Sequence, residues 1–348
     1  MEFSAPVTPF MPVPDRRFFS ARGQVADFLA SAEFFASGRD ALARALSLVN
    51  AFERTVWVPA YFCPWVVKSV KAQAWQLAVY DDFPTFDTPD FATLAPTDGD
   101  IVVAVDFFGT RDISAWVRWK AEHKSSVLIG DFSHAPFSEG AKNPAFDFSF
   151  ASLRKTLPVP DGGYLLGKNT PSKIYTKGGE GCDFAATYAL AANLANLDYK
   201  SAQDFYYNAE MRLNAKKNIS RISFGALNTI KMLDIEKMWR VRRENSGVLE
   251  ALLNKTSRAA LLKNEEKSSK DIFSTFCPTF ALESETLRDK LYAELGRNGI
   301  LASIYWGAKF MGNDAAKKVS NKMLTISLDF RHSTEDAENL ANIINSVL

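Results

Sequence analysis

The chain has 348 residues, of which 47% are apolar and 23% charged, and this composition excludes a disordered or low-complexity protein. The formal net charge of +1 leaves no overall basic field that could recruit nucleic acid or anionic lipid. The three cysteines have no paired spacing, which indicates neither a disulfide framework nor a zinc site. The chain starts without the apolar run of a signal peptide. We therefore expect a cytoplasmic enzyme or binding protein with no metal, nucleic acid or membrane partner.

Residues 1–15 are predicted to form an extended arm. Their prolines remove backbone donors and keep the preceding residues out of the helical region. Such an arm either packs on a neighbouring subunit or is loose. The segment Phe34–Leu46 then predicts a loop with a small-residue corner at Ser37-Gly38, followed by a helix rich in alanine and leucine. The first turn of that helix can hold an anion.

From Thr55 onward, short apolar runs alternate with helical stretches. The pattern predicts strands and helices in the order 56–58, 66–74 (helix), 77–80, 101–105, 114–123 (helix) and 127–130. Strands that alternate with helices predict a mostly parallel sheet covered by helices. Ligands of such sheets bind outside the carboxyl ends of the strands, where Asp106 and Asp131 fall.

The second half of the chain begins with helical periodicity between Gly178 and Lys217. Residues Ile230–Leu253 predict one long helix that links two domains. The lysine-rich segment 263–270 predicts a solvated loop.

A small α+β domain is expected at the C-terminal end. Its predicted elements, in chain order, are a strand at 276–282, a helix at 284–296, strands at 300–305 and 323–328, and a helix at 334–347. We accordingly expect a large domain over residues 1–235 and a small domain over residues 236–348.

The stretch 127–163 holds the residues with the clearest chemistry. A buried strand ends in Asp131, the next strand leads to Ser152 and Lys155, and the pair Gly162-Gly163 opens another strand. An acid at the tip of one strand and a lysine at the tip of another can face a single ligand.

A lysine amine in a cleft can condense with an aldehyde to form an imine, provided that a neighbour lowers its proton affinity. If the aldehyde is that of pyridoxal phosphate, the ring nitrogen needs a carboxylate partner that keeps it protonated. Lys155 and Asp131 meet these two requirements. The Ser152 hydroxyl and the backbone N–H groups of Gly38 and Arg39 can bind the cofactor phosphate.

With these motifs the chain resembles the DegT-type sugar aminotransferases, a branch of the fold-type I pyridoxal-phosphate enzymes. The similarity runs from Ser37-Gly38-Arg39-Asp40 through Val58-Pro59-Ala60-Tyr61 to Leu328-Asp329-Phe330-Arg331. Its most specific part is Asp131-Phe132-Ser133-His134 together with Ser152-Leu153-Arg154-Lys155. The resemblance implies an α/β fold, with a large pyridoxal-phosphate domain and a small C-terminal domain.

The resemblance also implies roles for the central residues. Lys155 is expected to hold the cofactor covalently and to shuttle protons, and Asp131 is expected to pair with the pyridine nitrogen. His134 is expected close to the ring or its 3-oxygen. Because some family members that carry histidine in place of the lysine are dehydratases, the intact Lys155 favours transamination.

Further positions of the family pattern are partly altered. Gly38, Arg39 and Ser152 are expected to hold the phosphate, although Arg39 replaces the usual small hydroxyl residue. Cys63 stands near the position that contacts the ring face, where an aromatic residue is frequent. The family forms its site between two subunits, so we expect a homodimer in which Arg221 reaches the phosphate of the partner.

The expected function is transfer of an amino group from an amino-acid donor, glutamate, to a keto sugar that is linked to a nucleotide. Two alternatives stay open: a degenerate member that binds the cofactor or a sugar nucleotide without turnover, and another pyridoxal-phosphate reaction on a small amino acid.

Some residues also have a plainer interpretation. Ser152 can cap local backbone, Arg39 can be a surface helix residue and Cys63 can serve packing alone. Asp329 and Arg331 can pair within the small domain. An aromatic group can form either a substrate wall or part of the core; it comprises Tyr199, Phe205, Tyr206 and Tyr207.

Overall fold

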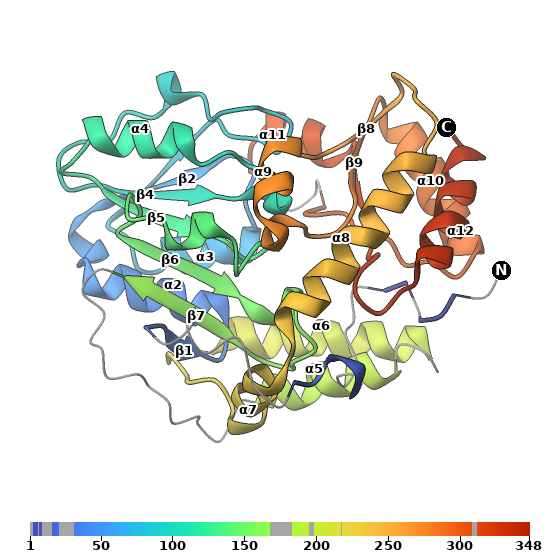
Figure 1. Cartoon of the computed structure of the whole chain (residues 1–348). Helices are drawn as coiled ribbons and strands as arrows, with labels where there is room; N and C mark the ends of the chain where they lie inside the picture. Colours follow the sequence, from blue (N-terminus) through green and yellow to red (C-terminus); the bar gives the residue numbers. More distant parts are fainter. Residues whose placement is uncertain are drawn as a thin grey trace.

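The computed structural model describes residues 3–5, 7–8, 16–20, 31–167, 183–194, 198–216, 218–307 and 312–348. Its main layer is a seven-stranded sheet (Figure 1). In spatial order the strands are β1 (Glu33–Phe35), β7 (Gly163–Gly167), β6 (Phe148–Ser152), β5 (Val127–Asp131), β4 (Ile101–Val105), β2 (Thr55–Pro59) and β3 (Gln76–Tyr80). Within this sheet β7 alone runs opposite to the other strands.

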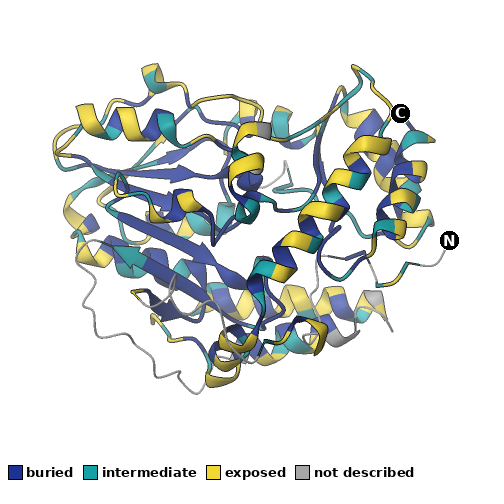
Figure 2. Ribbon diagram, in the orientation of Figure 1, coloured by how far each residue is buried: buried dark blue, intermediate teal, exposed yellow. Residues whose placement is uncertain are grey.

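Helices cover both faces of this sheet, and the central strand β4 shows how. Val103 packs in the core cluster of one face, whereas Val102 packs with Trp116 on the other. A strand covered on both faces needs apolar residues at every position, and all five residues of β4 are apolar and buried. The buried strands stand out between the partly exposed helices in Figure 2.

The helices divide between the two faces. On one face lie α2 (Gly38–Leu48) and α3 (Pro64–Lys71). The opposite face is covered by α4 (Ser114–Glu122), α7 (Phe224–Met232) and α8 (Ile235–Leu252). The antiparallel pair α5 (Asp183–Leu194) and α6 (Tyr199–Ala215) lies beyond the edge of the sheet that carries β1 and β7 (Figure 1). The predicted α/β class, with a mostly parallel sheet covered by helices, is confirmed.

A second, antiparallel sheet forms in the C-terminal part of the chain. Its strands are β10 (Met323–Thr325), β9 (Thr279–Leu282) and β8 (Ala259–Leu261), in that spatial order. The other helices of this part are α9 (Glu265–Lys270), α10 (Glu285–Arg297), α11 (Asp314–Ser320) and α12 (Thr334–Asn345). Apolar residues of β9, α8, α10 and α12 share one core. The long helix α8 runs from the large sheet to this part of the molecule (Figure 1).

The described part of the N-terminal arm packs on this second core. Val7 is buried in the cluster, and its carbonyl accepts a hydrogen bond of 2.8 Å from the Leu301 N–H. The Thr8 carbonyl accepts a bond of 2.7 Å from Arg331. This stretch of the arm therefore contacts its own chain.

The prediction of a single helix over 230–253 is wrong. The chain leaves the helical region at Leu233, and Asp234 begins α8 by accepting a hydrogen bond from the Lys237 N–H. The Asp234 N–H donates to the Phe18 carbonyl at 2.7 Å. Because Leu233 is also fully buried beside this segment, a contact distant in sequence favours the break over a continuous helix.

Three further predictions need correction. Residues 300–305 form no strand, and Ser303 makes only an isolated bridge with Thr325. Phe34 and Phe35, predicted as part of a loop, belong to the edge strand β1. The segment 263–270, predicted as a solvated loop, contains α9, and its Lys267 amine lies 2.6 Å from the Asp106 carboxylate. Across the described residues, no helix is both long and apolar enough to cross a membrane.

Candidate active site

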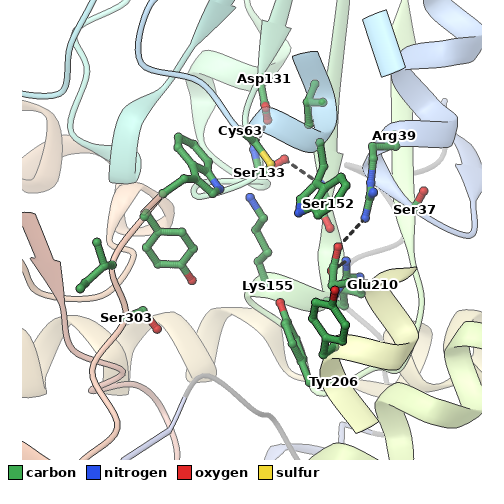
Figure 3. A pocket seen from close by; sticks show the side chains of 18 of the residues that line it. Ser37, Arg39, Cys63, Asp131, Ser133, Ser152, Lys155, Tyr206, Glu210 and Ser303 are labelled. Carbon is green, nitrogen blue, oxygen red and sulfur yellow. Dashed lines mark hydrogen bonds and ion pairs between the residues drawn. The ribbon is translucent and has the colours of Figure 1, made fainter. Parts of the chain in front are cut away.

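A cavity of about 550 Å³ lies at the carboxyl ends of β5 and β6. It brings Asp131, Ser152 and Lys155 together, as the sequence predicts. In Figure 3 the Lys155 side chain points toward Asp131, and Ser303 lies on the opposite wall. A volume of this size is typical of small-molecule sites.

Asp131 is the last residue of β5. Its Oδ1 atom accepts a hydrogen bond of 2.9 Å from the Ser133 N–H, which fixes the carboxyl group at the tip of the strand. Burial raises the pKa of Asp131, and the charge of Lys155 opposes this shift. A cationic N–H group placed beside this buried carboxylate would stabilise its charged form.

Lys155 ends the short helical turn Leu153–Lys155, which directly follows β6. Its amine lies 5.8 Å from the centre of the Trp306 ring. Among the described residues no carboxylate lies within ion-pair distance of this amine. The lysine therefore faces the cavity without a fixed partner.

The N-terminus of α2 approaches the same cavity because two glycines leave room for it. A Cβ atom at Gly163 would lie 2.4 Å from the carbonyl carbon of Ser37, and one at Gly38 would lie 3.0 Å from the Ser152 nitrogen. Ser37 caps the helix through a bond of 3.1 Å from the Asp40 N–H. The first N–H groups of α2 and the Ser152 side chain thus lie at one place, where they can bind an anion.

The Arg39 side chain points toward Glu210 of α6 (Figure 3). It forms an ion pair of 2.9 Å with Glu210 and a hydrogen bond with Asn214. Glu210 also pairs with Arg154 at 3.0 Å and accepts a hydrogen bond from Tyr188. The interpretation of Arg39 as an ordinary surface residue is wrong, and its guanidinium is already engaged by α6.

Glu210 is the central charge of this cluster. Burial raises its pKa, but Arg154 and Arg39 outweigh that effect and lower the pKa to about 2. Burial tends to lower the pKa of Arg154, yet Tyr188 and Glu210 raise it overall. Glu210 is therefore ionised and holds α6 against the cavity.

His134 lies behind the lining of the cavity, between two aromatic rings. Its ring is 5.0 Å from that of Phe108 and 4.5 Å from that of Phe276. Its Nδ1 atom accepts a hydrogen bond of 3.1 Å from the Phe108 N–H, so that Nε2 carries the proton of the neutral ring. Burial, followed by the charge of Lys155, lowers the pKa of His134 well below its usual value. Nε2 has no partner among the described residues.

The other two predicted residues differ in their placement. Cys63 lines the cavity as the residue before α3, and burial raises the pKa of its thiol. Arg221 is exposed, forms an isolated bridge with Phe35 and is absent from the described lining of this cavity. The structure thus brings all the predicted site residues to or directly behind one cavity except Arg221.

The structure adds cavity residues that sequence analysis missed. Glu210 had no recognisable motif, Tyr305 ends a segment predicted to be a strand, and Trp306 follows it. Tyr206 and Tyr207 line the cavity, so for them the core interpretation is wrong; Phe205 is half-buried, and the side chain of Tyr199 lies outside the described residues. Asp329 and Arg331 pair at 2.8 Å, as expected.

Comparisons with known proteins identify the fold. No known protein family and no curated protein matches the sequence. Among solved structures, the putative sugar aminotransferase Spr1654 from Streptococcus pneumoniae, in its PLP form, is 14% identical, with 98% of this chain and 100% of that chain covered and a TM-score of 0.67. PseC from Helicobacter pylori, an aminotransferase involved in the biosynthesis of pseudoaminic acid, is 12% identical, with 99% of both chains covered and a TM-score of 0.66.

A third similar structure is that of 3-amino-5-hydroxybenzoic acid synthase. It is 16% identical and has a TM-score of 0.63, with 91% of this chain and 86% of that chain covered. The chain therefore has the fold of the sugar aminotransferase structures over nearly its whole length. This finding agrees with the fold that the sequence resemblance implies.

Proposed function

We propose that the protein is a pyridoxal-phosphate-dependent aminotransferase that transfers an amino group from glutamate to a nucleotide-linked keto sugar. The observation that carries the proposal is the convergence of Asp131, Ser152 and Lys155 with the N-terminus of α2 in one cavity. The fold shared with sugar aminotransferases supports the same conclusion.

The residues of the cavity fit pyridoxal phosphate. The glycines at positions 38 and 163 let the first turn of α2 lie close against Ser152, so that both can donate hydrogen bonds to one phosphate. Asp131 offers a buried carboxylate, and Lys155 offers an amine that has no carboxylate within ion-pair distance among the described residues. When bound, the cofactor supplies an aldehyde that condenses with amines and a ring that withdraws electrons from them.

In this proposal each residue of the chain has a separate task. Lys155 would hold the cofactor through its amine, and the same amine, when free, would take and return the proton at the substrate carbon. Asp131 keeps a proton on the ring nitrogen by offering it a negative charge. The Nε2–H group of His134 has no partner among the described residues, because only Nδ1 accepts a hydrogen bond, and it would be the atom of this histidine that donates toward the cofactor.

The substrate and the assembly are also part of the proposal. The aromatic and polar wall of Tyr206, Tyr207 and Tyr305 suits a sugar, whose rings and hydroxyl groups stack and form hydrogen bonds. We propose a homodimer in which Arg221 reaches the partner's phosphate site. Its exposed position outside the described lining of its own cavity supports this arrangement.

The proposal is tested by adding pyridoxal phosphate to the purified protein. The absorption band typical of pyridoxal phosphate bound to a lysine should appear and vanish on borohydride reduction, and peptide mass spectrometry should then find the cofactor on Lys155. The K155A protein should bind the cofactor without this band. A reducible adduct on another lysine of the K155A protein would rule out the assignment.

A second candidate is a protein that binds the cofactor or a sugar nucleotide without turnover. The engagement of both Arg39 and Arg154 by Glu210 favours it, since these cations are then less available to a substrate. Conversion of the bound cofactor to its amine form by glutamate would exclude this candidate. Conversion by a small amino acid without transfer to any keto sugar would instead indicate another pyridoxal-phosphate reaction.

A further inference from the structure

A buried arginine connects α8 to the segment that carries Lys155. Arg242 is 0% exposed, and its Nη2 atom donates a hydrogen bond of 3.1 Å to the carbonyl of Thr156, the residue after Lys155. Its Nη1 atom donates a bond of 3.1 Å to the Phe276 carbonyl and lies 3.6 Å from the Cys277 sulfur. One guanidinium therefore joins three parts of the chain that are far apart in sequence.

The charge of Arg242 is not balanced by a neighbouring acid. Among the described residues, no carboxylate forms an ion pair with it, and its Nε atom has no hydrogen-bond partner. Aromatic rings lie on either side, with centres 5.1 Å away for Trp239 and 5.6 Å for Phe330. Cation–π contacts offset only part of the cost of burying a charge. An apolar side chain of similar length would fill the same space without that cost, so stability alone does not explain the guanidinium.

The two carbonyl groups that Arg242 binds belong to segments that support the site. Thr156 follows Lys155 directly, and its N–H donates to the Leu153 carbonyl at 3.0 Å, which closes the turn that carries the lysine. The Phe276 ring stacks on His134 at 4.5 Å. A planar group with donors in fixed directions sets the distance between two carbonyls, which a flexible ammonium group does not.

We propose that Arg242 is a positioning residue, which fixes the turn of Lys155 and the ring behind His134 relative to each other. Arg242 is not among the described residues that line the cavity, and it acts through its hydrogen bonds to the backbone of Thr156 and Phe276. Its importance for catalysis rests on the proposed function, whereas its effect on the geometry of the Lys155 turn does not.

The geometric part is tested by hydrogen exchange on the cofactor-free protein. In R242M, peptides that cover residues 153–158 should exchange about tenfold faster, while peptides from β4 and β5 should keep their rates. R242K, which keeps the charge but cannot hold both carbonyls equally well, should give an intermediate rate. The matched control is R243M, because Arg243 is the next residue of α8 and is exposed. Unchanged exchange over 153–158 in R242M, or equal acceleration everywhere, would overturn the proposal.

The functional part uses the same variants loaded with pyridoxal phosphate. R242M should shift the absorption maximum or the pH midpoint of the band that forms with Lys155, and it should lower kcat about tenfold with a smaller change in KM for the donor. R243M should match the wild type. If R242M changes exchange but the wild type forms no band, the proposed function fails and the geometric role stands. If the band and kcat of R242M equal those of the wild type, the positioning role is wrong. Should R242M not fold, R242K decides each of these outcomes.

Discussion

The two sides of the cavity are held in different ways. On the sheet side, Asp131, Ser152 and Lys155 follow the ends of buried parallel strands, so their backbone is fixed by the core. On the α6 side, Glu210 links a helix beyond the sheet edge to Arg39 and Arg154 through ion pairs. Hydrophobic packing and sheet hydrogen bonds thus position one side, whereas ion pairs act together with a small apolar cluster on the other.

This difference predicts that removal of a carboxylate charge lowers activity on the sheet side but lowers the stability of the protein on the α6 side. A carboxyl group on the sheet side can lose its charge without loss of its support, because the strand holds it. The carboxyl group of Glu210 on the α6 side is itself part of the support. Four substitutions test this contrast, from the largest expected effect to the smallest.

D131N should nearly abolish the proposed activity without destabilising the fold. Asparagine keeps the acceptor for the Ser133 N–H and removes a charge whose burial raises the pKa of Asp131. We expect kcat to fall about 10³-fold, which corresponds to about 4 kcal/mol, since a charge that stabilises the reacting state is lost. Urea unfolding of the cofactor-free protein should be unchanged. A destabilised D131N protein would show that the sheet side also depends on its charge.

E210Q should destabilise the protein, because it leaves two largely but not fully buried arginines, Arg39 and Arg154, without their acid. The expected loss is about 3 kcal/mol in the free energy of unfolding, measured with urea. E236Q is the matched control, since Glu236 forms an exposed pair with Arg240 whose loss should cost less than about 0.5 kcal/mol. Equal effects of the two substitutions would mean that charge does not hold α6.

G163A should disturb the approach of α2 to the cavity. The new Cβ atom would lie 2.4 Å from the Ser37 carbonyl carbon, so the backbone of α2 must move. We expect a loss of about 1–3 kcal/mol in unfolding free energy and weaker binding of pyridoxal phosphate. G247A is the control, because nothing lies within 4 Å of that position inside α8, and alanine should stabilise this helix by about 0.5–1 kcal/mol. Normal cofactor binding by G163A would contradict the placement of the phosphate.

H134F should make the stability of the protein less sensitive to acid. Below about pH 6.5 the unfolded chain binds a proton at this histidine. The folded chain does not, because burial lowers the pKa of His134. The wild type therefore loses up to about 1.4 kcal/mol per pH unit from this residue as the pH falls from about 6.5 toward 5.

Urea unfolding at several pH values measures this slope. H134F should lose less stability than the wild type over that range, whereas H123N, at a half-buried histidine on the end of α4, serves as the control. Equal slopes for H134F and the wild type would show that His134 is protonated in the folded chain.

Much of the fold was predictable because its signals are local. The strands around 101–105 and 127–130 are apolar at each position, as a doubly covered strand requires. The helix break at Leu233 and the irregular segment 300–305 were not predictable in the same way. The break at Leu233 depends on contacts with residues 16–20, and the backbone of 300–305 depends on the pairing of Ser303 with Thr325. Both sets of partners are distant in sequence.

The same division applies to the site. The sequence by itself was enough to predict that Asp131, Ser152 and Lys155 lie close together, because parallel strands bring residues at their carboxyl ends to one edge of the sheet. Only the tertiary structure decided that Glu210 neutralises Arg39 and that Arg242 binds the backbone behind Lys155. Helices α6 and α8 reach the site through packing whose partners lie far along the chain, and no local pattern encodes such contacts. The sheet side could therefore be predicted from sequence, and the α6 side could not.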